Sequence, residues 1–89
     1  MLRPVYTKRF EKDVKLSKKR GKDLSKLKGV LVLLIGEKIL AEKNRDHKLI
    51  GNFDGCRECH IEPDWLLVYK REGEEIIFVR TGTHSDLFD

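Results

Sequence analysis

Three histidines, His47, His60 and His84, lie in the second half of the chain and are its residues best suited to proton transfer. Histidine is the side chain whose ordinary pKa lets it both give and take a proton near neutral pH. Asp64 lies four residues after His60, and Arg80 lies four residues before His84. Histidines with a carboxylate and an arginine, on short strand and turn segments, indicate acid–base chemistry on an anionic substrate.

Each of these residues also has a purely structural interpretation. Asp64 follows Pro63, and an aspartate in a turn commonly bonds its own backbone. As a functional residue it would instead hold a histidine in one tautomer or accept a proton itself. Arg80 ends an apolar segment, and its planar guanidinium could clamp a phosphate.

Two aromatic residues, Trp65 and Phe88, have two interpretations each. Trp65 is the single tryptophan and precedes an apolar run, which favours a core anchor. The alternative is that its ring stacks on a nucleotide base. Phe88 is either tucked against the fold or used for binding.

The segment Cys56-Arg57-Glu58-Cys59-His60 matches the C-x-x-C-H pattern of haem attachment. We reject this interpretation, because strand residues alternate and the two thiols would point to opposite faces. A zinc site would need a second ligand pair, and a thioredoxin-like motif would need a helix N-terminus at the cysteines. We therefore expect two free thiols, no metal site and no cofactor, as suits a reducing cytoplasm.

Positive charge is concentrated in the first half of the chain. Residues 8–28 hold ten Lys/Arg and three Asp/Glu, whereas residues 49–89 hold four and nine. Such a block is the electrostatic footprint of a nucleic-acid binder, and the alternative is a solvated helix face. The cluster that we expect to meet RNA is Lys15, Lys18, Lys19, Arg20 and Lys22.

The chain of 89 residues has room for one domain, residues 1–89. No apolar run approaches the ~20 residues of a membrane span. The segment Met1-Leu2-Arg3-Pro4 lacks the features of a signal peptide. We expect a cytoplasmic protein with no membrane partner.

The hydrophobic pattern predicts the order β-α-α-β-β-β. Thr7 and Asp23 are the expected N-caps, Gly21 separates the helices, and the second helix has room to continue to Leu40. Residues 42–48 and 51–55 are expected to be loop and turn, and residues 81–89 a tail. The predicted fold is an α+β domain with two N-terminal helices packed on a mainly antiparallel sheet. The expected strands are 2–6, 56–61, 65–70 and 76–80, and the expected helices are 8–19 and 24 onward.

The strings Glu62-Pro63-Asp64-Trp65 and Arg80-Thr81-Gly82-Thr83-His84, with further strings along the chain, resemble the YafQ branch of the RelE/ParE toxin superfamily. The resemblance covers essentially the whole chain. The Glu-Pro-Asp-Trp and Arg-Thr-Gly-Thr-His strings are specific at this separation. Departures lie in the 36–45 loop, at Lys48 and at both cysteines, and they affect loop conformation and codon preference. The strings are Phe10-x-Lys12-Asp13-Val14-Lys15-Leu16, Asp23–Leu27, Arg45-Asp46-His47, Glu62–Lys70 and Arg80–Phe88.

The resemblance implies a RelE-like, microbial RNase-like fold and a toxin of a type II toxin–antitoxin pair. It implies an endoribonuclease that cleaves mRNA in the A site of the 70S ribosome and is silenced by a cognate antitoxin. By residue-for-residue match, His47, His60, Asp64 and His84 form the acid–base set. Arg80 is then the phosphate-stabilising arginine, and Trp65 and Phe88 are aromatics near the site.

The implied reaction needs no metal: a ribose 2′-hydroxyl attacks the adjacent phosphorus after losing its proton. We expect His84 as general acid, either His60 or Asp64 as base, and His47 and Arg80 as phosphate ligands. One alternative is an RNase that acts without ribosomes. Another is a ParE-like toxin that binds a protein target, which the three histidines disfavour because a pure binder has no use for them.

Overall fold

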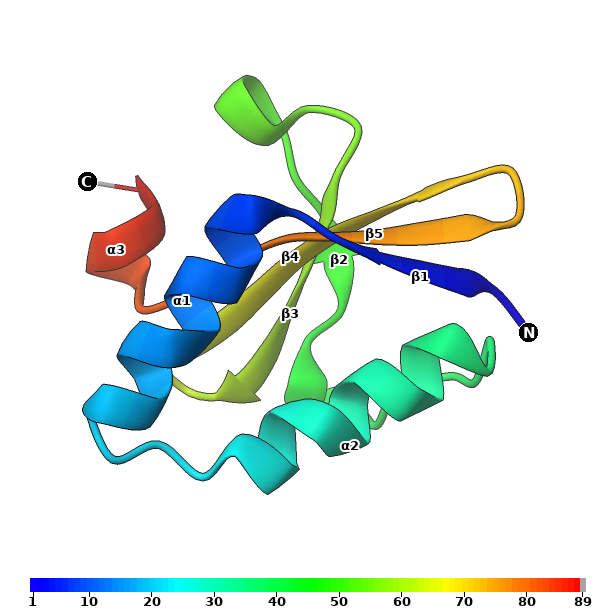
Figure 1. Cartoon of the computed structure of the whole chain (residues 1–89). Coiled ribbons are helices and arrows are strands. Elements are labelled where there is room, and N and C mark those ends of the chain that lie inside the picture. The colour runs from blue at the N-terminus through cyan, green and yellow to red at the C-terminus, as the bar shows by residue number, and fades with distance from the viewer. Residues whose placement is uncertain (89) are drawn as a thin grey trace.

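Five strands form one sheet in the order β1-β5-β4-β3-β2 in the computed structural model, which describes residues 1–88 (Figure 1). β1 pairs with β5 in parallel, and every other pairing is antiparallel. The mainly antiparallel α+β prediction is therefore confirmed. The strands are β1 Arg3–Tyr6, β2 His47–Lys48, β3 Arg57–Glu62, β4 Trp65–Glu72 and β5 Glu75–Gly82.

Two long helices follow β1, and both begin at the caps that the sequence predicts. The Thr7 hydroxyl accepts the backbone N–H of Phe10 at 2.9 Å, and Asp23 accepts that of Ser25 at 3.0 Å. α2 lies across one face of the sheet, and α3 lies beyond the end of β5 (Figure 1). The helices are α1 Lys8–Lys19, α2 Leu24–Ile35 and α3 His84–Phe88, with 3₁₀ turns η1 Glu42–Asn44 and η2 Gly51–Phe53.

Apolar side chains pack on both faces of the sheet. The larger cluster joins α1 and α2 to the sheet through residues such as Phe10, Leu27 and Phe78. The smaller cluster lies on the opposite face and includes Leu66, Val68 and Leu87. Cys59 belongs to the larger cluster and Cys56 to the smaller one, and both thiols are free. The prediction that the two thiols point to opposite faces is confirmed.

Three segments differ from the sequence prediction. α2 ends at Ile35, because Gly36 caps it and Glu37 then takes a φ of 60°. The predicted 42–48 loop contains η1 and β2. The predicted 81–89 tail continues β5 to Gly82 and then forms α3, while Asp89 lies outside the described residues. Within residues 1–88, no helix has the length and apolar character that a membrane span requires.

Candidate active site

The three histidines meet on the face of the sheet that carries the smaller apolar cluster. His60 is the cross-strand neighbour of Leu66, and Glu58 is that of Val68. His47 in turn pairs with Glu58 across β2 and β3. Directly paired residues share a face, so β2 and β3 present these side chains together. His84 enters the same place from the start of α3, with its ring centroid 5.7 Å from that of His60.

Asp64 fixes both the position and the tautomer of His84. Its Oδ1 accepts the backbone N–H of His84 at 2.8 Å and lies 2.6 Å from the ring Nδ1. Because a carboxylate oxygen can only accept here, Nδ1 carries a proton, and Nε2 is the ring nitrogen left for chemistry. The two hydrogen bonds from His84, the backbone one first, lower the pKa of Asp64 below its ordinary value of 3.8. Asp64 therefore stays ionised at neutral pH as the partner of His84.

The tautomer of His60 follows from its backbone contact. Its Nδ1 lies 3.2 Å from the carbonyl oxygen of Pro63, so Nδ1 donates. Its Nε2 then points toward the Glu58 carboxylate, 3.8 Å from Oε1. The His60 side chain is 11% exposed, whereas that of His84 is 54% exposed. His60 thus forms the floor of the site and His84 its rim.

Glu58 is a further member of the site, which the sequence reasoning missed. It is buried, and its Oε2 lies 3.2 Å from Nε2 of His47. The Nδ1 of His47 lies 2.6 Å from the Arg45 carbonyl and must donate to it. Glu58 would therefore form an ion pair with His47 whenever that imidazole is charged. Its position two residues before His60 on one strand was the available signal, since such residues share a face.

The same cluster offers a candidate metal site. One ligand atom from each of Glu58, His60 and His84 lies within 4.8 Å of the others. Imidazole nitrogens with a carboxylate suit first-row transition metals such as copper and zinc. The expectation of no metal site was based on the cysteines alone, and this trio contains neither thiol.

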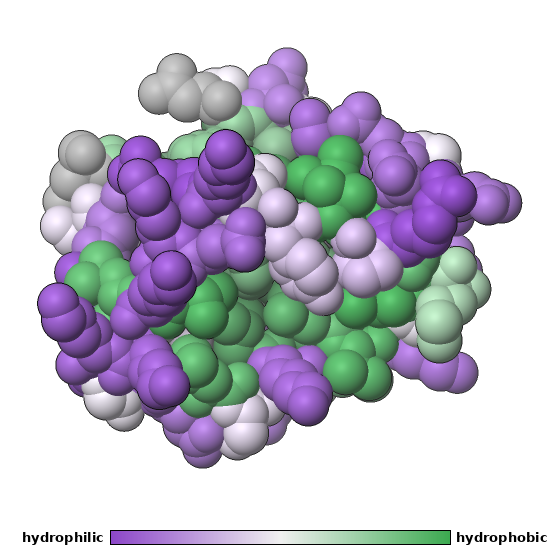
Figure 2. All heavy atoms as spheres, in the orientation of Figure 1, coloured by the Kyte–Doolittle hydropathy of each residue, from purple (hydrophilic) through white to green (hydrophobic). Residues whose placement is uncertain are grey.

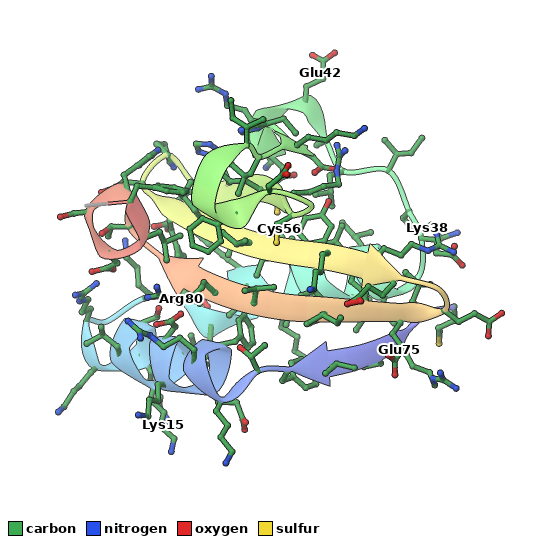
Figure 3. All side chains as sticks on the ribbon, turned by 90° about the horizontal axis from the view of Figure 1, so that it is seen from above. Lys15, Lys38, Glu42, Cys56, Glu75 and Arg80 are labelled. Atoms are coloured by element: carbon green, nitrogen blue, oxygen red, sulfur yellow. The ribbon has the colours of Figure 1, made fainter. Side chains whose placement is uncertain are left out.

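Arg80 forms a two-point ion pair with a buried aspartate. Its Nε and Nη2 donate to Asp13 of α1 at 2.8 and 3.2 Å. The same carboxylate accepts the backbone N–H of Thr81 at 3.1 Å. Figure 3 shows Arg80 on β5 at the side where α1 packs. The structure thus groups the three histidines with Asp64, while Arg80 joins a separate ion pair beside them.

Trp65 is a core residue, and the stacking interpretation is wrong for this structure. It is 1% exposed, and its indole N–H donates to the Thr81 hydroxyl at 3.0 Å. A ring covered in this way has no face for a base. Phe88 is 44% exposed and packs edge-on against Phe53, with 5.7 Å between ring centroids. Its ring lies 6.5 Å from that of His84, so it remains an aromatic at the rim of the site.

The predicted RNA-binding lysines and arginine separate into two groups. Lys15, Lys18 and Lys19 line a shallow groove on α1, together with Lys12 and Leu16. Hydrophilic side chains gather over α1 in Figure 2, and Lys15 points away from the helix in Figure 3.

Arg20 and Lys22 instead have carboxylate partners within the protein. Arg20 donates to Asp86 at 2.6 Å, and Lys22 and Lys26 both donate to Glu62 at 3.0 Å. A cation already paired with a carboxylate gains less binding free energy from a phosphate. Arg20 and Lys22 are therefore less suited to RNA contact than Lys15, Lys18 and Lys19.

Proteins from Escherichia coli are similar to this chain in both sequence and structure. A chain from Escherichia coli (strain K12) called "mRNA interferase toxin YafQ" is 46% identical over 84 residues, covering 93% of this chain and 91% of that one. The crystal structure of YafQ from E. coli strain BL21(DE3) matches with a TM-score of 0.95 and 42% identity, covering 100% of both chains.

Two further solved structures bear on partners and ligands. The E. coli DinJ-YafQ complex matches with a TM-score of 0.93 and 43% identity, covering 100% of both chains. A metal-bound toxin from Helicobacter pylori matches with a TM-score of 0.92 and 43% identity, covering 99% of this chain and 100% of that one. The family described as "Bacterial toxin of type II toxin-antitoxin system, YafQ" matches residues 2–89. The chain therefore belongs to the YafQ family of bacterial toxins.

Proposed function

We propose that this protein is an endoribonuclease that cleaves mRNA in the ribosomal A site without a catalytic metal. The observation that carries the proposal is the convergence of three imidazoles on one face of the sheet, with His84 fixed by Asp64 at 2.6 Å. The E. coli relative's name, mRNA interferase, supports RNA as the substrate. We place the reaction in the cytoplasm, where ribosomes and mRNA are found.

His84 is the general acid in this proposal. The 2′-oxygen forms a bond to the adjacent phosphorus, the bond from phosphorus to the 5′-oxygen breaks, and His84 Nε2 gives that oxygen its proton. The products are a 2′,3′-cyclic phosphate and a 5′-hydroxyl. Asp64 holds the ring in the required tautomer and stabilises its charged form.

His60 is the base that we favour over Asp64. Asp64 is already engaged with His84 through two hydrogen bonds, whereas His60 Nε2 faces the site. His60 takes the proton of the 2′-hydroxyl, and the nearby Glu58 carboxylate stabilises the imidazolium that forms. General acid and base catalysis each contribute roughly 10²–10⁴ in rate.

His47 and Arg80 are the proposed phosphate ligands. His47 is 50% exposed, and its Nε2 lies 3.2 Å from the Glu58 carboxylate, which would stabilise an imidazolium that faces the substrate. Asp13 takes two of the three guanidinium nitrogens of Arg80, and we propose that Nη1 contacts the phosphate. A guanidinium fixed by a buried carboxylate loses little conformational entropy when it binds.

The remaining partners follow from charge and from the relatives. We propose that Lys15, Lys18 and Lys19 on α1 bind ribosomal RNA by neutralising phosphates. We further propose that a cognate antitoxin silences the enzyme, as the DinJ-YafQ complex indicates for the E. coli relative.

A second, inhibitory property rests on the candidate metal site. Solved H. pylori toxins are described as metal-bound and copper-bound. We propose that Cu²⁺ or Zn²⁺ binds this protein through Glu58, His60 and His84. Such an ion would occupy the nitrogens of both the acid and the base, so it would block cleavage rather than assist it.

The decisive experiment is primer extension on a translated messenger, with and without ribosomes, using wild-type protein and His84→Ala. The toxin is first dialysed against EDTA, so that any bound transition metal is removed. We expect cleavage with ribosomes only, 5′-hydroxyl ends, and loss of cleavage in the folded His84→Ala variant. Cleavage without ribosomes would favour the free RNase, and growth arrest without cleavage would favour a toxin that binds a protein target.

A further inference from the structure

α3 carries His84 but is only five residues long, so it needs outside contacts to keep its place. Isolated helices shorter than about 12–15 residues are marginal in water. Asp64 holds the first residue of α3, and the buried side chain of Leu87 holds its last turn. A third attachment, which the proposed mechanism does not use, connects α3 to the end of α1.

The first half of this attachment is a reciprocal cap at the start of α3. The backbone N–H of Thr83 donates to Asp86 Oδ2 at 2.9 Å, and the backbone N–H of Asp86 donates to the Thr83 hydroxyl at 3.0 Å. This is the capping-box arrangement, in which two backbone donors at a helix start are satisfied at once. A Cβ at Gly82 would lie 2.9 Å from Asp86 Oδ2, so only glycine leaves room for the carboxylate.

The second half is a two-point ion pair from α1 to α3. Arg20 Nη1 donates to Asp86 Oδ2 at 2.6 Å, and Nη2 donates to Oδ1 at 3.2 Å. Arg20 is the C-cap of α1, and its own N–H is bonded to the Leu16 carbonyl. The guanidinium therefore projects from a fixed helix end and ties both oxygens of the capping carboxylate. Bidentate pairs of this kind give orientation as well as energy.

We propose that Arg20 is a positioning residue, which acts through Asp86 and Thr83 to hold α3 and thereby to place His84 and Phe88. This inference rests on the proposed function only for its effect on cleavage. It assigns Arg20 a role inside the protein, in place of the RNA contact expected from the sequence. The basic surface that meets RNA then ends at Lys19.

The test is a double-mutant cycle of Arg20→Ala and Asp86→Ala, with single-turnover cleavage as the readout. A displaced α3 misplaces the acid, and misplacement near 1 Å costs up to about 10²-fold. We expect each single variant to lose about 10- to 100-fold in the cleavage step with little change in KM. The double variant should lose no more than the worse single, because both remove one attachment.

Two matched variants separate positioning from general loss of charge or fold. Asp86→Asn keeps an acceptor for the Thr83 N–H but loses the ionic partner of Arg20, so it should fold and show most of the defect. Arg3→Ala removes an arginine on β1 from an exposed ion pair with Glu75 on β5, 3.8 Å apart, and should cleave normally. If Arg20 contacts RNA instead, its loss raises KM, flattens the salt dependence of binding and adds to Asp86→Ala; that result would overturn the proposal.

NMR spectroscopy tests the attachment of α3 without relying on the cleavage reaction. NMR signals of the His84 ring and the Phe88 amide should shift in Arg20→Ala but not in Arg3→Ala. If the wild type fails to cleave mRNA, the proposed function fails, yet these shifts still test the attachment. Unchanged His84 and Phe88 signals in Arg20→Ala would show that α3 does not depend on Arg20.

Discussion

One oxygen of Asp64 binds His84 twice, through the backbone N–H at 2.8 Å and through Nδ1 at 2.6 Å. The carboxylate comes from the turn between β3 and β4, and the histidine begins α3, 20 residues later in the sequence. This contact therefore fixes the main chain and the ring of His84 together. A substitution at Asp64 disturbs the orientation of the acid as well as its charge.

Asp64→Asn should lower the cleavage rate by about 10²-fold, in the range of one acid–base contribution. The pKa of Asp64 is already lowered by its bonds from His84, so the wild-type carboxylate is ionised throughout pH 5–8. The loss should therefore persist at every pH in that range. Rate measurements at several pH values check this. A defect that disappears at one end of the range would contradict the role of Asp64 as a constant partner.

Glu58→Gln should reduce cleavage by about 10- to 100-fold and also abolish the binding of Cu²⁺ or Zn²⁺. The amide has nearly the same shape, but it lacks the charge that would pair with a charged His47 or stabilise a charged His60. Calorimetric titration with each metal and single-turnover cleavage give the two readouts. Glu75→Gln on β5 is the matched control. Normal cleavage by a folded Glu58→Gln protein would remove Glu58 from the site.

Charge reversal at Lys15, Lys18 and Lys19 should weaken ribosome binding, because neutralising each phosphate releases counterions. The slope of log affinity against log salt should flatten by roughly 0.7–0.9 for each phosphate that the variant no longer neutralises. Binding isotherms across a salt series measure it. Reversal of Arg3, Lys38 and Lys70, which lie off α1, serves as control. Equal slopes for both triple variants would mean that the α1 face is merely solvated.

Asp86 should stabilise the fold in a pH-dependent way. Hydrogen bonds from Arg20, the largest cause, and from Thr83 lower the pKa of Asp86 from 3.8 to about 2. A group with a depressed folded pKa stabilises the protein fully above its unfolded pKa, and this stabilisation is lost as pH falls toward the folded value. Asp86→Asn should therefore cost about 1–2 kcal/mol at pH 6, and the difference from wild type should shrink steadily between pH 4 and 2. Urea unfolding at each pH measures both proteins; a difference that grows on acidification would refute the assignment.

Both cysteines should remain unreactive thiols in the native protein. Burial raises the pKa of Cys59 to about 12, and burial also raises that of Cys56. A thiol reagent at pH 8 should react slowly with folded protein and quickly with two thiols after unfolding. Cys59→Ser should destabilise by about 1–3 kcal/mol, because the new hydroxyl would be buried in the larger apolar cluster. Rapid labelling of Cys59 in folded protein would contradict its burial.

The regular elements could be predicted because local chemistry determines them. Thr7 and Asp23 are caps by residue type, and the alternation that separates Cys56 from Cys59 follows from strand geometry. Helix α3 was not predicted, although its Thr83–Asp86 cap is local, because so short a helix also relies on the contact of Arg20 with Asp86, residues 66 apart. Arg80 was recognised as a functional candidate, but its buried partner Asp13 comes from α1 and has no local signal. Glu58 was missed because its role depends on β2, a strand of two residues.

The parallel pairing of β1 with β5 affects when a newly made chain can become harmful. Arg3–Tyr6 pair with Glu75–Phe78, so the first strand has no partner in the sheet until residues 75–78 have been synthesised. Contacts between such distant segments form late and cooperatively. The histidines, meanwhile, come together only on the completed sheet. Under the proposed function, this late pairing delays cleavage during synthesis, and a cognate antitoxin already present in the cell gains time to capture the chain.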